Sequence, residues 1–154
     1  MTYAANTNVP VSKSRAEIEH LLTRHGATRF ASMSESGRGV IMFEAEGRRV
    51  MFSLPLPKRE EFAQRLKHGR MQPASPDWTD AAHEQACRSR WRSLALIIKA
   101  KLEAVDSGVS TFQDEFLAFI VLPGGDTVGS YVAAQIEAIY QGGMPTMLQL
   151  GAGR

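Results

Sequence analysis

The chain has 154 residues, of which 44% are hydrophobic and 22% are charged, with 18 Lys and Arg against 16 Asp and Glu. This length and composition predict one globular domain with a proper core, and a net charge of +2 is too small to identify a partner. No apolar run approaches the ~20 residues that cross a bilayer, and the first residues lack the profile of a secretory signal. We therefore expect a cytoplasmic protein without a membrane partner.

The N-terminal residues are polar and interrupted by proline, and 1–12 are expected to form a flexible arm. Ser14 and Glu17 have the spacing of a capping box, in which the Ser hydroxyl accepts from an amide of the first turn and Glu reaches back. Hydrophobic residues follow at helical spacing, and Gly26 is a typical helix stop. A first helix over about 14–25 is therefore predicted.

Three short runs with the strand period of two come next, over 28–36, 39–46 and 48–56. The breaks between them contain glycine, which suits tight hairpins. Pro55 and Pro57 end the last run because proline cannot donate to a continuing ladder. The pattern predicts a three-stranded antiparallel meander.

The rest of the chain is predicted to be mainly helical. A short helix over 58–67 and an irregular loop to residue 76 precede a long helix over about 78–106, which Asp77 or Thr79 would cap. Ser110 or Thr111 opens a further helix, and Asp126 or Thr127 opens a last one with an apolar stripe of Val128, Val132, Ile136 and Ile139. The order predicts a single α+β domain over 13–150: an N-terminal helix, the meander, and an α-rich C-terminal half with one long helix and two shorter ones.

The long helix carries the most suggestive stretch, CRSRWRSLALIIKAK over 87–101. At 100° per residue Trp91 falls inside an apolar stripe about 80° wide, so we interpret it as core. The cations border this stripe on two flanks. One flank, Arg88, Arg92 and Lys99, is either a row that contacts phosphates or a solvated edge whose aliphatic stems cover the core.

The predicted sheet offers a second basic surface. Arg29, Arg48 and Arg49 lie on or beside its strands, with aromatic and Met side chains nearby. Cations and aromatic rings on an exposed sheet hold single strands in several folds. The alternative is that the arginines protect the sheet edge against aggregation.

Neither a metal site nor a catalytic site is indicated. Cys87 is the only cysteine, so one chain can form no disulfide and no cysteine-based zinc site. The four histidines lack metal-ligand spacing, and the Gly-rich stretch 124–129 lacks the Lys-Ser/Thr of a phosphate loop. No nucleophile-elbow motif marks any serine, and Cys87 lies in the apolar stripe, where a buried, inert thiol is expected. We predict no metal, no cofactor and no catalysis.

The segments VSKSRAEIEHLL, RWRSLALIIKAKLEAV and TFQDEFLAFIVLP resemble small uncharacterised proteins of bacteriophages and mobile elements, over about Val9 to Leu150. The resemblance implies no activity and transfers no functional residue. It raises two classes of role, the handling of phage nucleic acid and the blocking or adapting of a host protein.

The resulting hypothesis is a non-catalytic accessory protein that binds DNA or RNA through backbone phosphates. The uneven charge supports it, because 58–70 and 87–101 are locally basic whereas 103–137 contains acids and no Lys or Arg. The alternative is a protein-interaction module, an inhibitor or adaptor of a host protein or a homodimer. It would use the apolar segment MPTMLQL and the flat helical surface.

Overall fold

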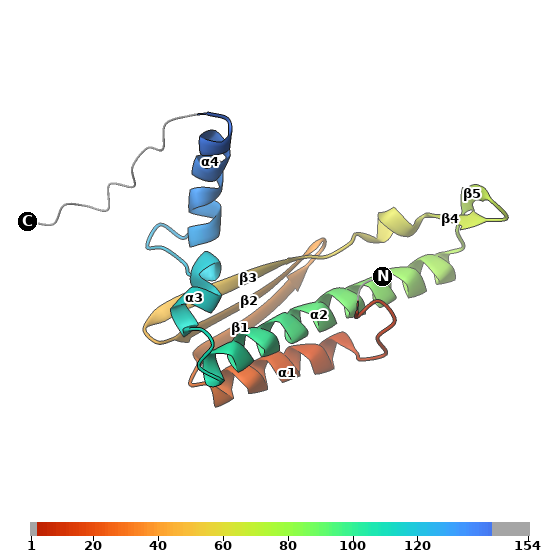
Figure 1. Ribbon diagram of the computed structural model, residues 1–154. Coiled ribbons are helices and arrows are strands. Elements are labelled where there is room, and N and C mark those ends of the chain that lie inside the picture. Colours follow the sequence, from red (N-terminus) through yellow and green to blue (C-terminus); the bar gives the residue numbers. More distant parts are fainter. Residues whose placement is uncertain (1–2, 143–154) are drawn as a thin grey trace, which may run out of the picture.

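The fold is α+β, as predicted. The computed structural model describes residues 3–142. In chain order its elements are α1 (Val11–Arg24), β1 (Thr28–Glu35), β2 (Arg38–Ala45), β3 (Arg48–Pro55), the 3₁₀ turn η1 (Arg59–Phe62), β4 (Gln64–Lys67), β5 (Arg70–Pro73), α2 (Pro76–Asp106), α3 (Phe112–Phe116), the 3₁₀ turn η2 (Leu117–Phe119) and α4 (Val128–Tyr140). Helices α1 and α2 lie side by side against the three-stranded sheet, and α2 continues well past α1 (Figure 1).

The first three strands form the predicted antiparallel meander in the order β1-β2-β3. Glu46 and Gly47 connect β2 to β3 with φ angles of 49° and 70°, the left-handed pair that a type I′ hairpin turn requires. The register places Phe43 opposite Val50, and both side chains are fully buried. The alternation seen in the sequence therefore separates a core-facing side of the sheet from an outer side.

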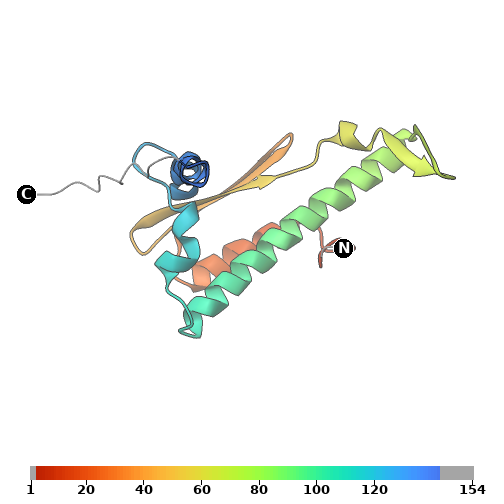
Figure 2. The same cartoon turned by 45° about the horizontal axis from the view of Figure 1, so that its top comes forward.

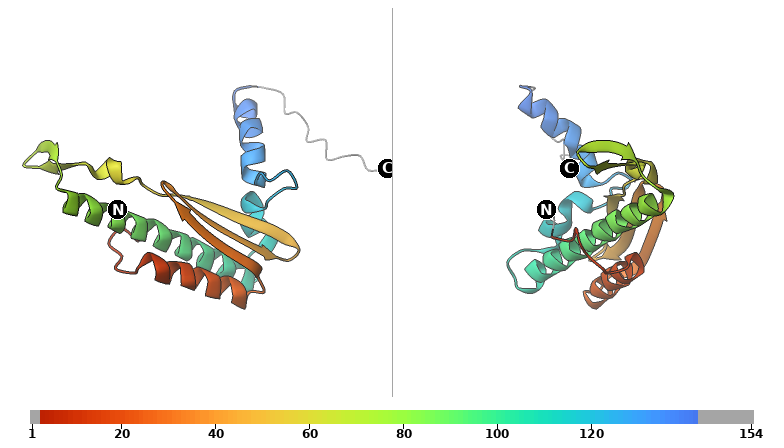
Figure 3. Two further views of the ribbon diagram at one scale, coloured as in Figure 1. Left: turned by 180° about the vertical axis from the view of Figure 1, so that it is seen from behind. Right: turned by 90° about the vertical axis from the view of Figure 1, so that its right-hand side faces the viewer.

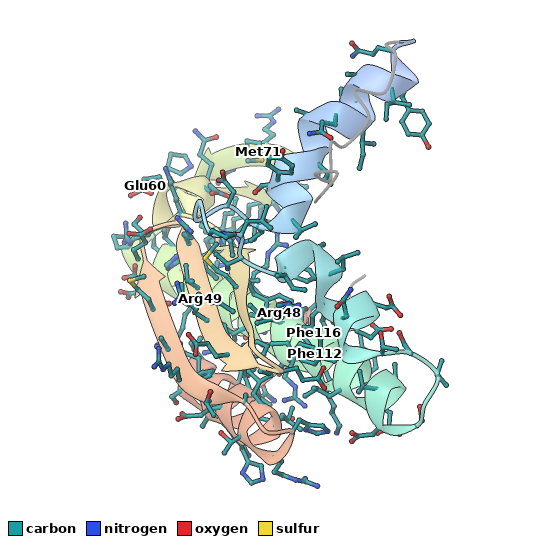
Figure 4. All side chains as sticks on the ribbon, turned by 90° about the vertical axis from the view of Figure 1, so that its left-hand side faces the viewer. Arg48, Arg49, Glu60, Met71, Phe112 and Phe116 are labelled. Carbon is teal, nitrogen blue, oxygen red and sulfur yellow. The ribbon has the colours of Figure 1, made fainter. Side chains whose placement is uncertain are left out.

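The core lies between this sheet and the helices. Trp91, Leu94, Ile98 and Leu102 of α2 are buried, so the stripe predicted on the long helix is confirmed over these positions and Trp91 is core. Phe116 of α3 meets Phe43 and Phe52 edge-on, with ring centroids 6.0 and 6.1 Å apart. Figure 4 shows Phe112 and Phe116 pointing from α3 towards the sheet.

Helix α1 begins at Val11, so the capping box predicted at Ser14 is wrong. Pro10 holds the extended N-cap position, with φ −60° and ψ 151°, and its carbonyl accepts from the amides of Lys13 and Ser14. Ser14 is instead a small residue inside the helix, fully buried, and its hydroxyl has no hydrogen-bond partner among the described residues. The ring of Pro10 fixes its backbone φ angle, so the helix starts directly after it, three residues before Ser14.

The stretch before α1, predicted to be a flexible arm, contacts α2 in this structure. The Gln85 side-chain amide donates to the carbonyls of Ala5 and Thr7, 3.0 Å from each. Ala4 is buried.

The short helix predicted over 58–67 and the irregular loop after it are wrong. Only η1 is helical, and β4 and β5 follow as a two-stranded antiparallel hairpin that projects at the N-terminal end of α2 (Figure 2). His68 and Gly69 have φ angles of 51° and 73°, so this hairpin also closes on a two-residue turn of type I′. We call β4, β5 and this turn the ribbon.

Of the caps predicted for the three later helices, that of α2 is wrong and those of α3 and α4 are confirmed. Ser75 caps α2, with its hydroxyl 3.4 Å from the Trp78 amide, in place of Asp77 or Thr79 because Pro76 occupies the first helical position. Thr111 caps α3 and Thr127 caps α4, as predicted. The helix predicted from 110 is shorter than expected, since η2 follows after five residues.

The contact between α2 and β2 gives a test of the core. A Cβ on Gly39 would lie 2.6 Å from Trp91 Cζ2, although the glycine does not need a positive φ. We expect Gly39→Ala to lower the free energy of unfolding by about 1–3 kcal/mol through overpacking. Urea unfolding measures this. Gly124→Ala is the matched control, because a Cβ there meets nothing within 4 Å, and it should leave the stability nearly unchanged. An equal loss in both variants would contradict the packing argument.

Candidate nucleic-acid interface

Two of the three cations predicted on the α2 flank are paired with acids. Arg88 Nη1 lies 2.5 Å from Glu84 Oε1, and its other nitrogens donate to the Gln85 side chain. Arg92 Nη1 lies 2.5 Å from Glu17 Oε2, a contact that ties α2 to α1 in a half-buried setting. Lys99 is exposed and belongs to none of the ion pairs within 3–142. The flank therefore presents one unneutralised charge.

The sheet arginines meet at a single carboxylate. Arg29 Nη1 and Arg49 Nη2 lie 3.6 and 3.5 Å from the same Glu44 oxygen, on three neighbouring strands. Arg48 Nη1 donates only to the Gly47 carbonyl, at 3.5 Å, among the contacts of the described residues. An open hollow of about 400 Å³ adjoins this end of the sheet, where Figure 4 shows Arg48 and Arg49. Glu44 offsets part of the positive charge.

A third basic surface, the ribbon, was missed as a site by the sequence analysis. The register pairs Arg65 with Gln72 and Lys67 with Arg70, so three cations share one face. Leu66 and Met71 pair on the opposite face and are 71% and 61% exposed. The ribbon thus has a basic face and an apolar face, and it contains no acidic residue.

In the part of the chain that the structure describes, the basic face of the ribbon has no charge partner. None of the ion pairs formed within 3–142 includes Arg65, Lys67 or Arg70. Like charges directly opposite on paired strands, as at Lys67 and Arg70, destabilise a hairpin. An anionic ligand at this face would remove that cost.

The ribbon is attached to the body through its base. The Arg65 guanidinium lies 5.5 Å from the Trp78 ring centroid, and Ala74 donates its amide to the Ala63 carbonyl at 2.9 Å. Next to it, Arg59 Nε lies 2.5 Å from Asp80 Oδ1 and ties η1 to α2, and this hydrogen bond holds the pKa of the Asp80 carboxyl below its usual range. The cations of the tip are therefore presented on an anchored support.

Two histidines pair with a Cys or an Asp side chain, as a catalytic dyad would require. His83 Nε2 donates to the Pro57 carbonyl at 3.0 Å, and the same nitrogen lies 3.5 Å from Cys87 Sγ. A nitrogen that already carries a proton cannot take one from the thiol, and burial raises the pKa of Cys87. A nucleophilic thiol needs the opposite shift, so this pair is not arranged as a catalytic dyad.

The second pair joins the C-terminal ends of α1 and α2. His25 Nδ1 lies 2.7 Å from the Leu21 carbonyl and Nε2 lies 2.6 Å from Asp106 Oδ2. Both nitrogens face acceptors, and only the protonated ring has two donors. The hydrogen bond to the Leu21 carbonyl is the largest influence and raises the pKa of His25. Burial comes next and lowers it, and the hydrogen bond and charge of Asp106 raise it again, so that the pKa is raised on balance. Both nitrogens are engaged within the protein, so the pair acts as a clamp between helices.

Within residues 3–142, no group of three or more His, Cys, Asp and Glu side chains is placed to hold a metal ion. In the same part of the chain, no helix combines the length and the apolar character needed to cross a membrane. The segment MPTMLQL, predicted to dock a partner, lies outside the described residues. No family model matches the chain, no curated protein matches its sequence, and no solved structure matches its fold.

The pairing of Arg92 predicts a structural effect. Arg92→Gln leaves the half-buried Glu17 carboxylate without its cation, so we expect a loss of about 1–2 kcal/mol in the free energy of unfolding. Denaturant unfolding measures the loss. Arg90→Gln, which removes an exposed cation of the same helix, is the control and should be nearly neutral. If both variants lose the same stability, the Arg92–Glu17 contact contributes nothing specific.

The His25 clamp predicts a pH dependence. Because folding raises the His25 pKa above its unfolded value of about 6.5, its stabilisation is complete below that pH and is lost as pH rises through the folded pKa. Asp106→Asn should therefore reduce stability more at pH near 5.5 than at pH near 8.5. Unfolding at both pH values measures this, with the exposed Glu103→Gln as control. A loss in Asp106→Asn that is independent of pH would refute the clamp.

Proposed function

We propose that this protein is a non-catalytic accessory protein that binds nucleic acid through backbone phosphates, and that the ribbon makes the main contact. The observation that carries the proposal is the basic face of Arg65, Lys67 and Arg70, which lacks a carboxylate partner within 3–142. Cations that neutralise phosphates release condensed counterions, and this release supplies most of the affinity of sequence-independent binding.

The shape of the ribbon supports duplex DNA as the ligand. A two-stranded β-ribbon fits the major groove, which is about 12 Å wide. The ribbon projects from the body at one end of α2, and no other described helix or strand lies beyond its tip (Figure 2). A groove could therefore be entered without a steric clash from the sheet or from α1.

The surfaces predicted from the sequence take supporting roles in this proposal. The Lys99 side chain is exposed to solvent, and Arg48 lies at the edge of an open hollow. Arg88 and Arg92 are held by Glu84 and Glu17, and a phosphate would have to compete with these carboxylates. We rank the ribbon first because binding there breaks no ion pair.

Binding through two ribbon cations can be measured by its dependence on salt. For a labelled duplex, the Lys67→Gln/Arg70→Gln variant should bind more weakly than the wild type. Its plot of log affinity against log salt should be shallower by about 1.8, since each phosphate contact contributes about 0.9. Fluorescence anisotropy over a salt series gives both values.

The control variant is Lys13→Gln/Arg90→Gln, which removes the same charge from exposed positions of α1 and α2. It should bind nearly as tightly as the wild type. An equal weakening would show that net charge and not the ribbon sets the affinity, and weakening by Lys99→Gln alone would move the site to α2. No binding of the wild type at low salt to duplex DNA, single-stranded DNA or RNA would refute the proposal.

A further inference from the structure

Helix α4 stands away from the rest of the molecule and carries apolar side chains that nothing in the described chain covers. Figures 1 and 3 show it projecting from the end of the body where α3 lies. None of its residues is fully buried. Its large side chains remain exposed by 52%, 49%, 45% and 87% at Tyr131, Ile136, Ile139 and Tyr140.

The base of α4 is nevertheless firmly attached. Gly129 packs so closely on η2 that a Cβ there would lie 2.9 Å from the Ala118 carbonyl oxygen. The Val128 amide donates to the Ile120 carbonyl at 2.9 Å, and the Val128 side chain packs against the core. The helix therefore leaves the body in a fixed direction, and its later turns extend into solvent.

The uncovered residues continue a stripe that starts in the core. At 100° per residue Val128, Val132, Ile136 and Ile139 lie within an arc of about 80°. The first of these packs on the body, whereas Ile136 and Ile139 are nearly half exposed. An apolar stripe of this width is what a helix presents to another helix. A helix of this length is marginal alone in water, so burial of the stripe would stabilise it.

The near absence of charge on α4 indicates which kind of partner can cover the stripe. Glu137 is the only charged residue of Val128–Tyr140, and its carboxylate accepts from the Gln141 side chain at 2.7 Å. A polyanion has no cation to bind on α4, and a basic partner meets only Glu137, which at 100° per residue lies on the side of the helix away from the stripe. A second α4 carries the same neutral apolar stripe, so two copies meet without repulsion along it.

The area of the stripe sets the expected strength. Tyr131 and Tyr140 flank the stripe, and a fully buried aromatic side chain covers about 150–250 Å². Together with the exposed parts of Ile136 and Ile139, they offer on the order of 400–500 Å² per copy. A stable interface of standard size buries about 800 Å² per partner. The stripe is smaller than this, so we expect a weak dimer that dissociates on dilution.

We propose that α4 pairs with the α4 of a second copy of this chain through Val132, Ile136 and Ile139. This inference goes beyond the proposed function and does not rest on nucleic-acid binding. A dimer formed in this way carries two ribbons. A duplex that engages both would be held by an intramolecular second contact, which raises the apparent affinity without any new contact type.

Sedimentation of the full chain from micromolar to millimolar concentration tests the proposal. The wild type should pass from monomer to dimer, and Ile136→Arg should shift the dissociation constant at least tenfold upwards because it places a charge in the seam. Ala134→Arg is the matched control: it adds the same charge to an exposed position on the opposite side of the same helix and should dimerise as the wild type does. Circular dichroism shows whether both variants keep the helix.

A second measurement uses the single native cysteine. In a Cys87→Ser background, Ile136→Cys or Ile139→Cys should form an oxidised dimer, and Ala134→Cys should not. A wild type that stays monomeric at all concentrations overturns the proposal, as does a dimer that Ile136→Arg leaves intact. If that monomer binds vesicles of neutral phospholipid, a lipid surface covers the stripe and the second copy does not.

Discussion

The contact of Trp91 with the sheet is the constraint on which the rest of the structure depends. Trp91 is almost completely buried, and its ring lies where a side chain on Gly39 would be. Arg15 of α1 lies over the same ring at 5.4 Å and donates to the Ser32 hydroxyl and carbonyl of β1. One indole thereby fixes α2, α1 and the sheet together, and the glycine is needed because no other residue allows this approach.

Because α2 is fixed to the body at Trp91, its N-terminal end can support the ribbon. The first turns of α2 extend past α1 and the sheet (Figure 1). Trp78 in these turns contacts Arg65 of the ribbon, and Asp80 holds η1, which leads into the ribbon. A two-stranded hairpin alone is only marginally stable in water. Its attachment to a rigid helix keeps the cations of its tip in a defined place. The Trp91 contact therefore positions a candidate site that it does not touch.

Most of the fold could be predicted from the sequence because local signals and burial agree there. These signals depend on residues close together in the sequence. They are the period of two in β2 and β3, the caps at Thr111 and Thr127, and the helical spacing of the stripe around Trp91. The ribbon was harder to predict. Strand β4 has only four residues, so its alternation of polar and apolar side chains is too short to stand out, and the charged residues before it favour a helix. The turn at His68-Gly69, with a strand on each side, was the signal that could have found it.

The candidate site was missed for a related reason: a sequence shows which cations are present, but not which acids neutralise them. Glu17 lies 75 positions before Arg92, and nothing in the spacing indicates that the two meet. The basic stretch 87–101 therefore looked stronger than the ribbon, although the fold pairs Arg88 and Arg92 and, among residues 3–142, gives Lys67 and Arg70 no carboxylate partner. Charge that the fold has neutralised supports the core, and charge that it leaves unpaired is available to a ligand. On this distinction, Arg88 and Arg92 of α2 are structural, and we propose the ribbon as the binding surface.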